Sequence, residues 1–579
     1  MRRLWSYLRR YRWRYAAGGL CLLGTATLAM LVPYLLKRAI DVLAHPDAPG
    51  GVGGYALAII GIACAQAAVR TASRTLIFNV GRDVEYDLRN DLFAHLERLP
   101  LAYYHEQHTG DLMSRVINDV TAVRMLLGPG MLNLINTPIY YAYAVAIMLT
   151  LDPWLTLAAL APYPGLLLVV KRFTRRLMEH TLHVQEGLAD LSTHVQENLS
   201  GMHVVRAYAC EAIQSQSFAT RNARFKDQSM QLARTRGQML PVMRTAAGLG
   251  TLVVLWYGGA KVIDARLSLG DLVAFIGYLN LLAWPTMALG WMLSILQRGR
   301  AALARLEHIF ATAPTIQDAP DAPALPCVRG AVEYRNVEFA YRTAGNGHRV
   351  LAGVSFRLEP GHTLALVGRT GAGKSTIATL LPRLFDVSAG QVLLDGRDVR
   401  TVPLAQLRRS IGFVPQDPFL FSTSVRENIR FGRPEADDAA IERAAGIAGV
   451  ADDIARFPRG YDTVVGERGV TLSGGQKQRL TLARAVLANP PVLVLDDALS
   501  SVDTRTERAI LSALDSTRPA RTRIVIAHRI STVQDADVIA VVDDGRIIEL
   551  GDHATLLARD GVYAELFRQQ RLEDELAVL

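Results

Sequence analysis

The stretch LALVGRTGAGKST, from Leu364 to Thr376, decides the fold of the second half of this 579-residue chain. Its apolar start predicts a buried strand, a glycine-rich turn follows, and a helix begins near Lys374. Gly368, Gly373, Lys374 and Ser375 have P-loop spacing, which lets backbone N–H groups converge on phosphate oxygens at a helix N-terminus. Lys374 can reach the β- and γ-phosphates, and the Ser375 hydroxyl can bind Mg²⁺. We expect ATP and Mg²⁺ as cofactors, with nucleotide contacts from Gly368, Arg369, Thr370, Gly371, Ala372, Gly373, Lys374, Ser375 and Thr376.

A second stretch, PPVLVLDDALSSVD (490–503), carries paired carboxylates. Its aliphatic run reads as a buried parallel strand that delivers Asp496 and Asp497 to a sheet edge. One carboxylate suits a magnesium ion. The other stands where a nucleotide hydrolase needs a general base, and the commonest form of this motif has Glu there. The sequence therefore raises the question of whether this site hydrolyses ATP.

A third stretch, TLSGGQKQRLTLARAVL, begins at Thr471. Ser473, Gly474 and Gly475 precede a helix and give a second N-terminus with donors for phosphate. One domain that holds one ATP does not need two such helix starts. Two domains that face each other head to tail do, with each site built from both chains.

The first half of the chain has the composition of a membrane domain. Half of all residues are hydrophobic and 20% are charged. Six apolar stretches are long enough to cross a hydrocarbon core of about 30 Å as helices. They are predicted at 15–36, 55–78, 131–151, 154–170, 245–263 and 270–293.

The distribution of Lys and Arg orients these spans. The short connections carry almost no Lys or Arg, whereas the long connections, 79–130 and 171–244, are rich in Arg. By the positive-inside rule, the long connections and both termini face the cytosol, which predicts a multi-pass protein of the cytoplasmic membrane. The same rule explains the net charge of +9, so we expect no nucleic acid as a partner. Helical periodicity in the long connections predicts cytosolic helix extensions, each broken once by a short crosswise helix.

Two features of the first half remain open. Arg70 and Arg74 lie in the second span, one helical turn apart, and either face a cavity or sit near the cytosolic end in water or headgroups. The four cysteines are scattered without a CxxC pair, which gives neither a disulfide framework nor a metal site. We divide the chain into an interfacial elbow helix (1–14), a transmembrane domain (15–310), an Ala- and Pro-rich linker (311–330) and a nucleotide-binding domain (331–579).

The P-loop, LSGGQ and VLVLDD occur together and in this order, and nearly the whole chain resembles the ATP-binding cassette (ABC) exporters of the half-transporter type. The resemblance implies a multi-domain fold, with an all-α six-helix transmembrane domain followed by an α/β P-loop NTPase cassette. It implies that Ser473, Gly474, Gly475 and Gln476 contact ATP. It also implies a second half-transporter as partner, membrane lipid around the spans and a small-molecule substrate.

The resemblance assigns the remaining site residues. Tyr341 matches the aromatic that stacks on adenine, and Gln416 matches the glutamine that touches Mg²⁺ and the attacking water. Asp496 matches the magnesium-associated aspartate, so that Ser375, Gln416 and Asp496 form the expected metal set. His528 matches the switch histidine that contacts the γ-phosphate, and Asp497, Gln416 and His528 are the expected catalytic residues. In the cassette loop 463–469, Val464 replaces the usual Glu, which puts that contact in doubt.

Asp497 departs from the family pattern, because most active members have Glu. Asp is one methylene shorter, and a misplacement of about 1 Å can cost about a hundredfold in rate. A weak base beside a complete signature resembles the Asp-bearing subunit of bacterial heterodimeric multidrug exporters, with ATP hydrolysed chiefly at the partner's P-loop. The alternative is a homodimer with slow Asp-based turnover.

We therefore expect ATP-driven export of an amphipathic drug or lipid. An ATP-gated regulator and an importer on the same scaffold remain open, whereas six apolar spans argue against a soluble ABC ATPase that acts on nucleic acid.

Overall fold

The computed structural model describes residues 2–44, 52–319, 322–341, 349–466, 469, 472–517, 521–527, 529 and 533–578. They form two compact units. The first comprises Met1–Glu97 and Gly110–Thr312, and the second comprises Arg98–Thr109 and Ala313–Leu579. The segment Arg98–Thr109 thus lies inside the predicted transmembrane domain in sequence but groups with the second unit.

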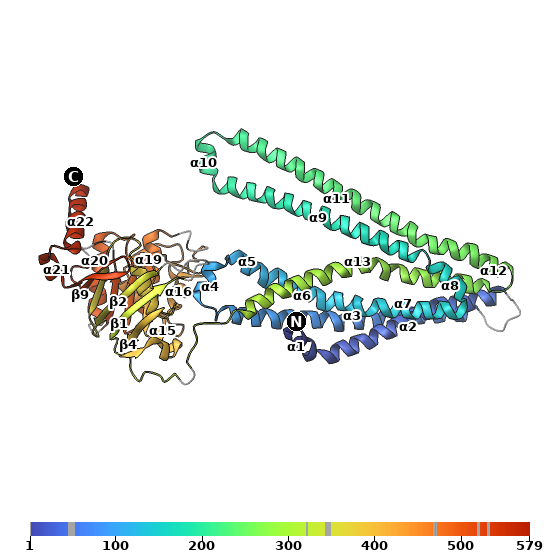
Figure 1. Ribbon diagram of the computed structural model, residues 1–579, viewed down its shortest axis with the longest axis horizontal. Helices are drawn as coiled ribbons and strands as arrows, with labels where there is room; N and C mark the ends of the chain where they lie inside the picture. Colours follow the sequence, from blue (N-terminus) through green and yellow to red (C-terminus); the bar gives the residue numbers. More distant parts are fainter. Residues whose placement is uncertain are drawn as a thin grey trace. The chain divides into compact units, whose positions relative to one another are not determined.

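The first unit is helical, and its longest helices extend well beyond membrane length (Figure 1). α9 and α11 run side by side as a hairpin joined by the short helix α10. The helices are α1 Arg2–Arg10, α2 Arg12–Ala44, α3 Val52–Leu96, α5 Thr109–Ser114, η1 Arg115–Asp119, α6 Val120–Met125, η2 Leu126–Gly130, α7 Met131–Leu151, α8 Pro153–Leu160, α9 Tyr163–Ser200, α10 Met202–Ala207, α11 Glu211–Val253, η3 Val254–Gly258, α12 Gly259–Ile263 and α13 Leu269–Ala311.

Four helices in the described part of the chain are long and apolar enough to cross a membrane: Arg12–Ala44, Val52–Leu96, Thr109–Leu151 and Leu269–Ala311. They contain four of the six predicted spans. The other two, 154–170 and 245–263, fall on interrupted helical segments. Pro162 lies in the break between α8 and α9, and the π-helical turn η3 separates α11 from α12. Proline lacks the N–H that continues a helix, and a π-turn shifts the hydrogen-bond ladder.

The second unit is an α/β domain with two sheets. A four-stranded antiparallel sheet has the order β2-β1-β4-β5, and a six-stranded sheet has the order β10-β9-β3-β8-β7-β6. In the larger sheet β9, β3, β8, β7 and β6 are parallel, so their carboxyl ends share one edge. The strands are β1 Val332–Ala340, β2 Arg349–Leu358, β3 Thr363–Val367, β4 Ala389–Leu394, β5 Arg397–Asp398, β6 Ile411–Val414, β7 Val492–Asp496, β8 Thr522–Ile526, β9 Val538–Asp543 and β10 Arg546–Gly551.

The helices of this unit cover the larger sheet and form a separate helical lobe. Their bounds are α4 Leu101–Glu106, α14 Lys374–Leu380, η4 Val399–Thr401, α15 Leu404–Arg409, α16 Val425–Arg430, α17 Asp438–Ile447, α18 Ala451–Ala455, η5 Gly460–Asp462, α19 Gly474–Leu487, α20 Thr504–Thr517, α21 His553–Ala558 and α22 Val562–Val578.

The burial of β7 on both faces explains why its sequence is a continuous apolar run. Val492 and Val494 belong to the core that includes α14, whereas Leu493 and Leu495 face the core of the helical lobe. A strand buried on both faces has no polar face, so its sequence does not alternate. The next residue, Asp496, is thereby directed toward α14.

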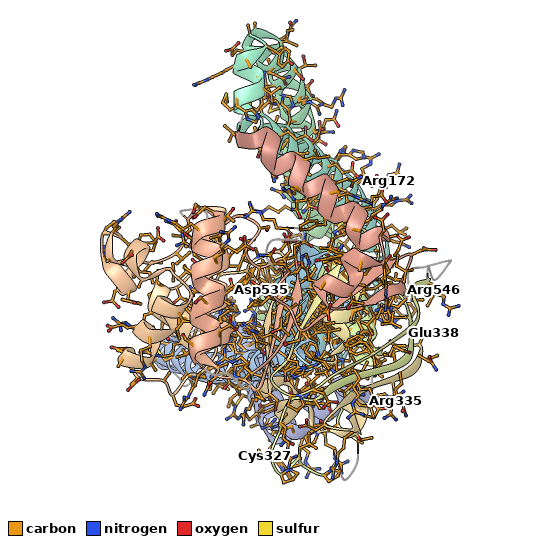
Figure 2. All side chains as sticks on the ribbon, turned by 90° about the vertical axis from the view of Figure 1, so that its left-hand side faces the viewer. Arg172, Cys327, Arg335, Glu338, Asp535 and Arg546 are labelled. Atoms are coloured by element: carbon orange, nitrogen blue, oxygen red, sulfur yellow. The ribbon has the colours of Figure 1, made fainter. Side chains whose placement is uncertain are left out.

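The segment Arg98–Thr109 packs on the second unit through α4. Ala102 contacts the core under the two sheets, and the rings of His105 and Phe385 lie 5.9 Å apart. At the surface, Cys327 is exposed, and Figure 2 shows it at the periphery of this unit. All four cysteines are free.

Candidate functional site

The phosphate loop joins β3 to α14, and three glycines shape it. Gly368, Gly371 and Gly373 have φ of +145°, +87° and +101°, a region that L side chains rarely adopt. A Cβ at Gly368 would overlap the carbonyl oxygen of Val542 on the neighbouring strand. Gly371 instead has nothing within 4 Å of an added Cβ, so its backbone is open to a ligand.

Lys374 closes this loop from inside. Its Nζ donates to the carbonyl oxygens of Gly368 at 2.8 Å and Arg369 at 2.9 Å. Burial lowers the pKa of the Lys374 ammonium, and the carboxylates of Asp496 and Asp497 oppose that shift. A buried cation held by carbonyl oxygens beside two carboxylates is a ready partner for an anionic phosphate.

The side chains of Ser375 and Asp496 are hydrogen-bonded to each other at the carboxyl edge of the larger sheet. The Ser375 hydroxyl donates to Asp496 Oδ1 at 2.9 Å, and Asp496 is 4% exposed. A hydroxyl and a carboxylate are oxygen ligands of the kind that Mg²⁺ prefers, usually with several waters and phosphate oxygens completing the shell. The residues present therefore fit a magnesium ion bound together with a nucleotide.

Asp497 leaves the strand in a left-handed conformation, with φ of +48°. Its backbone is fixed on both sides. The N–H donates to Ile526 O at 3.0 Å, and the carbonyl accepts from the Ser500 hydroxyl at 3.1 Å and from Gln478 Nε2 at 3.4 Å. Among the described residues, no hydrogen bond engages the Asp497 carboxylate. Its side chain is half-buried.

The other predicted catalytic residues follow neighbouring strands. Gln416 lies two positions beyond β6, which pairs with β7, and its side chain is exposed. Its strand therefore ends at the same sheet edge as Asp496. His528 follows β8 but lies outside the described residues.

Tyr341 stands at the end of β1 with its ring half-buried. The ring makes edge contacts with Phe339 at 4.8 Å and Phe385 at 5.4 Å between centroids. Its hydroxyl lies 3.2 Å from Thr376 Oγ1 in α14, the helix that follows the phosphate loop. The geometry thus brings the aromatic residue next to α14.

The signature residues form a complete capping box at the start of α19. Ser473 Oγ accepts from Gln476 N at 3.3 Å, and Gln476 Oε1 accepts from Ser473 N at 3.0 Å. Ser473 and Gly474 are exposed. Within the described part of the chain, no hydrogen bond connects Ser473 or Gln476 with the phosphate loop. The signature residues therefore form an exposed helix start that is not bonded to the phosphate loop of the same chain.

Gln478 is a residue of this region that the sequence reasoning missed. It is 4% exposed, its Nε2 donates to Ser500 Oγ at 2.9 Å, and its Oε1 accepts from Ser501 N at 3.0 Å. It thereby connects the signature helix with the loop after Asp497. The available signal was position, because Gln478 shares a helix face with Leu482 and Ala485, at the spacing of a core stripe.

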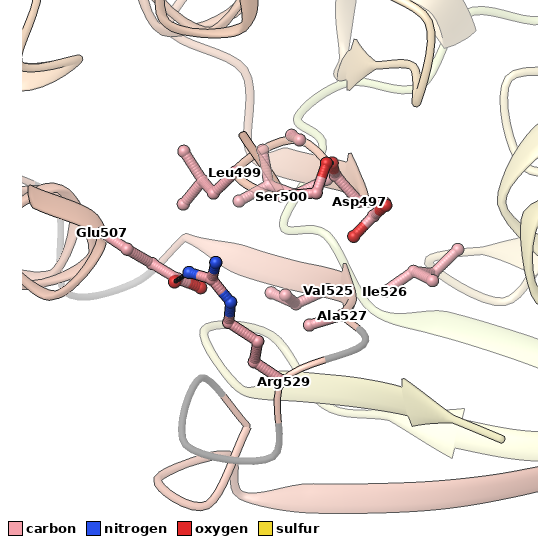
Figure 3. A pocket seen from close by; sticks show the side chains of 10 residues that line it. Asp497, Leu499, Ser500, Glu507, Val525, Ile526, Ala527 and Arg529 are labelled. Carbon is pink, nitrogen blue, oxygen red and sulfur yellow. Dashed lines mark hydrogen bonds and ion pairs between the residues drawn. The ribbon is translucent and has the colours of Figure 1, made fainter. Parts of the chain in front are cut away.

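Glu507 and Arg529 support the same loop from the other side (Figure 3). Arg529 Nη1 donates to Val502 O and to Glu507 Oε2, both at 3.0 Å, and Glu507 is 5% exposed. A pocket of about 220 Å³ lies between them and Asp497. Glu507 shares the apolar face of α20 with Ile510 and Leu514, and this position in the sequence was a weak indication that Glu507 is buried. Nothing in the sequence indicated a structural role for Arg529.

Replacing Gln478 with Leu should destabilise the second unit by about 1–3 kcal/mol, because Ser501 N–H loses its buried acceptor. Denaturant unfolding of the purified chain measures the change. Thr481→Val on the same helix is the control, since among the described residues the Thr481 hydroxyl donates only to the carbonyl of Lys477 within its own helix. Equal effects of the two substitutions would contradict a role for Gln478 in fixing the loop.

Comparisons with known proteins identify the family. The family model for the ABC transporter transmembrane region matches residues 15–286, and the ABC transporter model matches residues 351–500. The multidrug resistance-like ATP-binding protein MdlA of Escherichia coli (strain K12) is 36% identical, with 99% of this chain and 97% of the relative covered. The chain belongs to the ABC exporters.

Two further proteins are similar over nearly the full length. The ATP-dependent lipid A-core flippase of Syntrophus aciditrophicus (strain SB) is 34% identical over 99% of this chain and 95% of its own. The structure of a bacterial Atm1-family ABC exporter with ATP bound has a TM-score of 0.80 and 30% identity, covering 97% of this chain and 98% of that chain. The predicted fold class, a helical transmembrane domain followed by an α/β ABC cassette, is confirmed. This ABC exporter is an ATPase coupled to transport.

Proposed function

We propose that this chain is one half of a dimeric exporter that moves a small amphipathic molecule, a drug or a lipid, across the cytoplasmic membrane at the expense of ATP. One observation supports this most directly. The P-loop, the Ser375–Asp496 pair and a complete signature occur in one chain with an apolar helical unit. The names of the relatives, a multidrug resistance-like protein and a lipid flippase, agree with this substrate class.

Each site residue has a role in this proposal. Tyr341 stacks on adenine, Lys374 binds the β- and γ-phosphates, and Gln416 orients the attacking water. His528 contacts the γ-phosphate. Ser473, Gly474, Gly475 and Gln476 serve the ATP of the partner subunit, which agrees with the exposure of Ser473 and Gly474 at the helix start. Mg²⁺, when bound through Ser375, Gln416 and Asp496, neutralises phosphate charge.

Asp497 makes this chain's own site weak. The shorter side chain of Asp could reach the position of a Glu carboxylate only if its backbone moved toward the nucleotide. The Asp497 backbone is held in place, because its N–H donates to Ile526 O and its carbonyl accepts from the Ser500 hydroxyl. The carboxylate therefore stays about 1–1.5 Å short of the position that Glu would reach, and such a misplacement slows general-base catalysis. This favours a heterodimer in which the partner supplies a Glu.

The orientation follows from the same scheme. The cassette and both ends of the described chain lie in the cytosol. The elbow helix α1 supports this orientation, because it is rich in Arg, as the positive-inside rule expects of a cytosolic segment. Its Arg10 forms an ion pair with Asp87 of α3, at 3.0 Å.

The test is reconstitution of the chain in vesicles, alone and with a second half-transporter that has Glu at the corresponding position. We expect little ATP hydrolysis alone, and hydrolysis with export of a fluorescent amphiphile for the pair. Full turnover by this chain alone would favour the homodimer. ATP binding without turnover in any pair would contradict the export proposal.

A further inference from the structure

Two arginines interrupt the apolar stretch of α3. Arg70 and Arg74 lie one helical turn apart, and both side chains are exposed. The buried face of the same helix segment carries Ser73, Ile77 and Val80. By helical spacing Arg70 continues this stripe toward Val52 and Arg74 lies next to it, yet both side chains are exposed.

We take the polar contacts between the segment around Tyr11–Arg14 and α3 as the cytosolic boundary of the membrane. Arg14 pairs with Asp83, and the Tyr11 hydroxyl donates to Asp87 at 2.9 Å. At about 1.5 Å per helical residue, Arg70 lies about 20 Å outward from Asp83 and about 27 Å inward from Val52, where α3 begins.

These distances place Arg70 near the middle of a bilayer whose full thickness is about 40–45 Å. The antiparallel neighbour α2 agrees. A Cβ on Gly24 would lie 3.6 Å from Val69, and Gly24 belongs to the apolar part of α2. With this boundary, Arg70 lies too deep for the headgroup position, which favours the interpretation that it faces a cavity.

The surroundings lack a counter-charge. Residues 52–82 of α3 contain no Asp or Glu, and neither do residues 12–40 of α2 or 131–151 of α7. Among the described residues, no ion pair involves Arg70 or Arg74. The outer end of this unit differs, because Lys37 pairs with Asp271 and Lys261 with Asp152, each at 2.5 Å.

Polar groups extend this cationic stripe. Gln66 lies one turn before Arg70 on α3, and Tyr140 lies on α7, a helix that contacts α3. Gln66 and Tyr140 are half-buried. Guanidinium groups at mid-membrane depth are costly unless they face water, a partner group or a ligand. Their planar donors bind phosphate and carboxylate oxygens in pairs.

We propose that Arg70 and Arg74, with Gln66 one turn before them, form a subsite for the anionic head of an amphiphile. This inference rests on the proposed export function and narrows its substrate class to molecules with a phosphate or carboxylate head and an apolar tail. The occupant is either a transported molecule or a resident acidic lipid, since both have the same head chemistry.

The assembled transporter in phosphatidylcholine nanodiscs tests the subsite. Without ATP, we expect 1-myristoyl lysophosphatidic acid to bind at least tenfold more tightly than 1-myristoyl lysophosphatidylcholine, which has the same tail. Arg70→Gln combined with Arg74→Gln should abolish this preference, whereas the double Lys variant should retain most of it. Arg82→Gln is the matched control, because Arg82 is exposed on the same helix next to Asp83 at the cytosolic boundary.

A second arm identifies the occupant. ATP-driven uptake of lysophosphatidic acid into inside-out vesicles, lost in the double Gln variant, identifies a transported anion. Phosphatidylglycerol that co-purifies with the wild type and not with the variant, without such uptake, identifies a resident lipid. Equal binding of the two probes to the wild type, or an unchanged preference in the double Gln variant, overturns the subsite. Retained preference without ATP-driven uptake of any probe would instead contradict export and leave the subsite standing.

Discussion

Replacing Asp497 with Glu should raise the ATPase rate of this chain's own site by up to about a hundredfold, because the added methylene restores the reach of the carboxylate. The two acids have nearly the same intrinsic pKa, so the substitution changes position and leaves basicity nearly unchanged. Space is available, since Asp497 borders a pocket of about 220 Å³. The measurement is steady-state ATP hydrolysis by the purified chain, alone and in the dimer.

Asp497→Gln is the matched control for this prediction. Gln has the length of Glu and no base, so it should leave hydrolysis at or below the wild-type rate. ATP binding should survive in both variants, because the contacts of Lys374 and Ser375 are untouched. A fall in hydrolysis with Glu would mean that the backbone hydrogen bonds of Asp497 direct a longer side chain away from the nucleotide.

The cassette was predictable from sequence because its signals are local. The spacing of the P-loop glycines reflects backbone angles that only glycine adopts easily, as the φ of +145° at Gly368 shows. The unbroken apolar run of β7 reflects burial on both faces. Asp496 ends the strand and accepts a hydrogen bond from Ser375 at the carboxyl edge of the sheet, as the motif predicts.

The features that were missed depend on contacts between distant segments. Gln478 meets Ser501 across a loop, and Arg529 meets Glu507, and no local pattern encodes either pair. The depth of Arg70 was undecidable from hydropathy alone. The contact between Arg14 and Asp83, which the sequence does not predict, supplies the reference point for the depth proposed for Arg70.

The phosphate loop supports a second large effect. Gly368→Ala should destabilise the second unit by roughly 2–5 kcal/mol, because the new methyl group overlaps the Val542 carbonyl and the backbone angle is strained. Thermal or denaturant unfolding measures this loss. Gly371→Ala should be milder, at about 1–2 kcal/mol, because nothing lies within 4 Å of its added Cβ and only the strain of φ +87° remains.

Gly371→Ala should nevertheless weaken ATP binding at least tenfold, because close approach of the phosphate to the loop backbone requires a residue without a side chain. Gly353→Ala separates the two causes. Gly353 has φ of +83° and equally open space, but it lies in β2, outside the phosphate loop. We expect the same small loss of stability with unchanged ATP affinity, measured by titration with a fluorescent nucleotide. Equal ATP affinities for Gly371→Ala and Gly353→Ala would show that the open space at Gly371 does not receive the phosphate, and the nucleotide would then have to bind elsewhere on the loop.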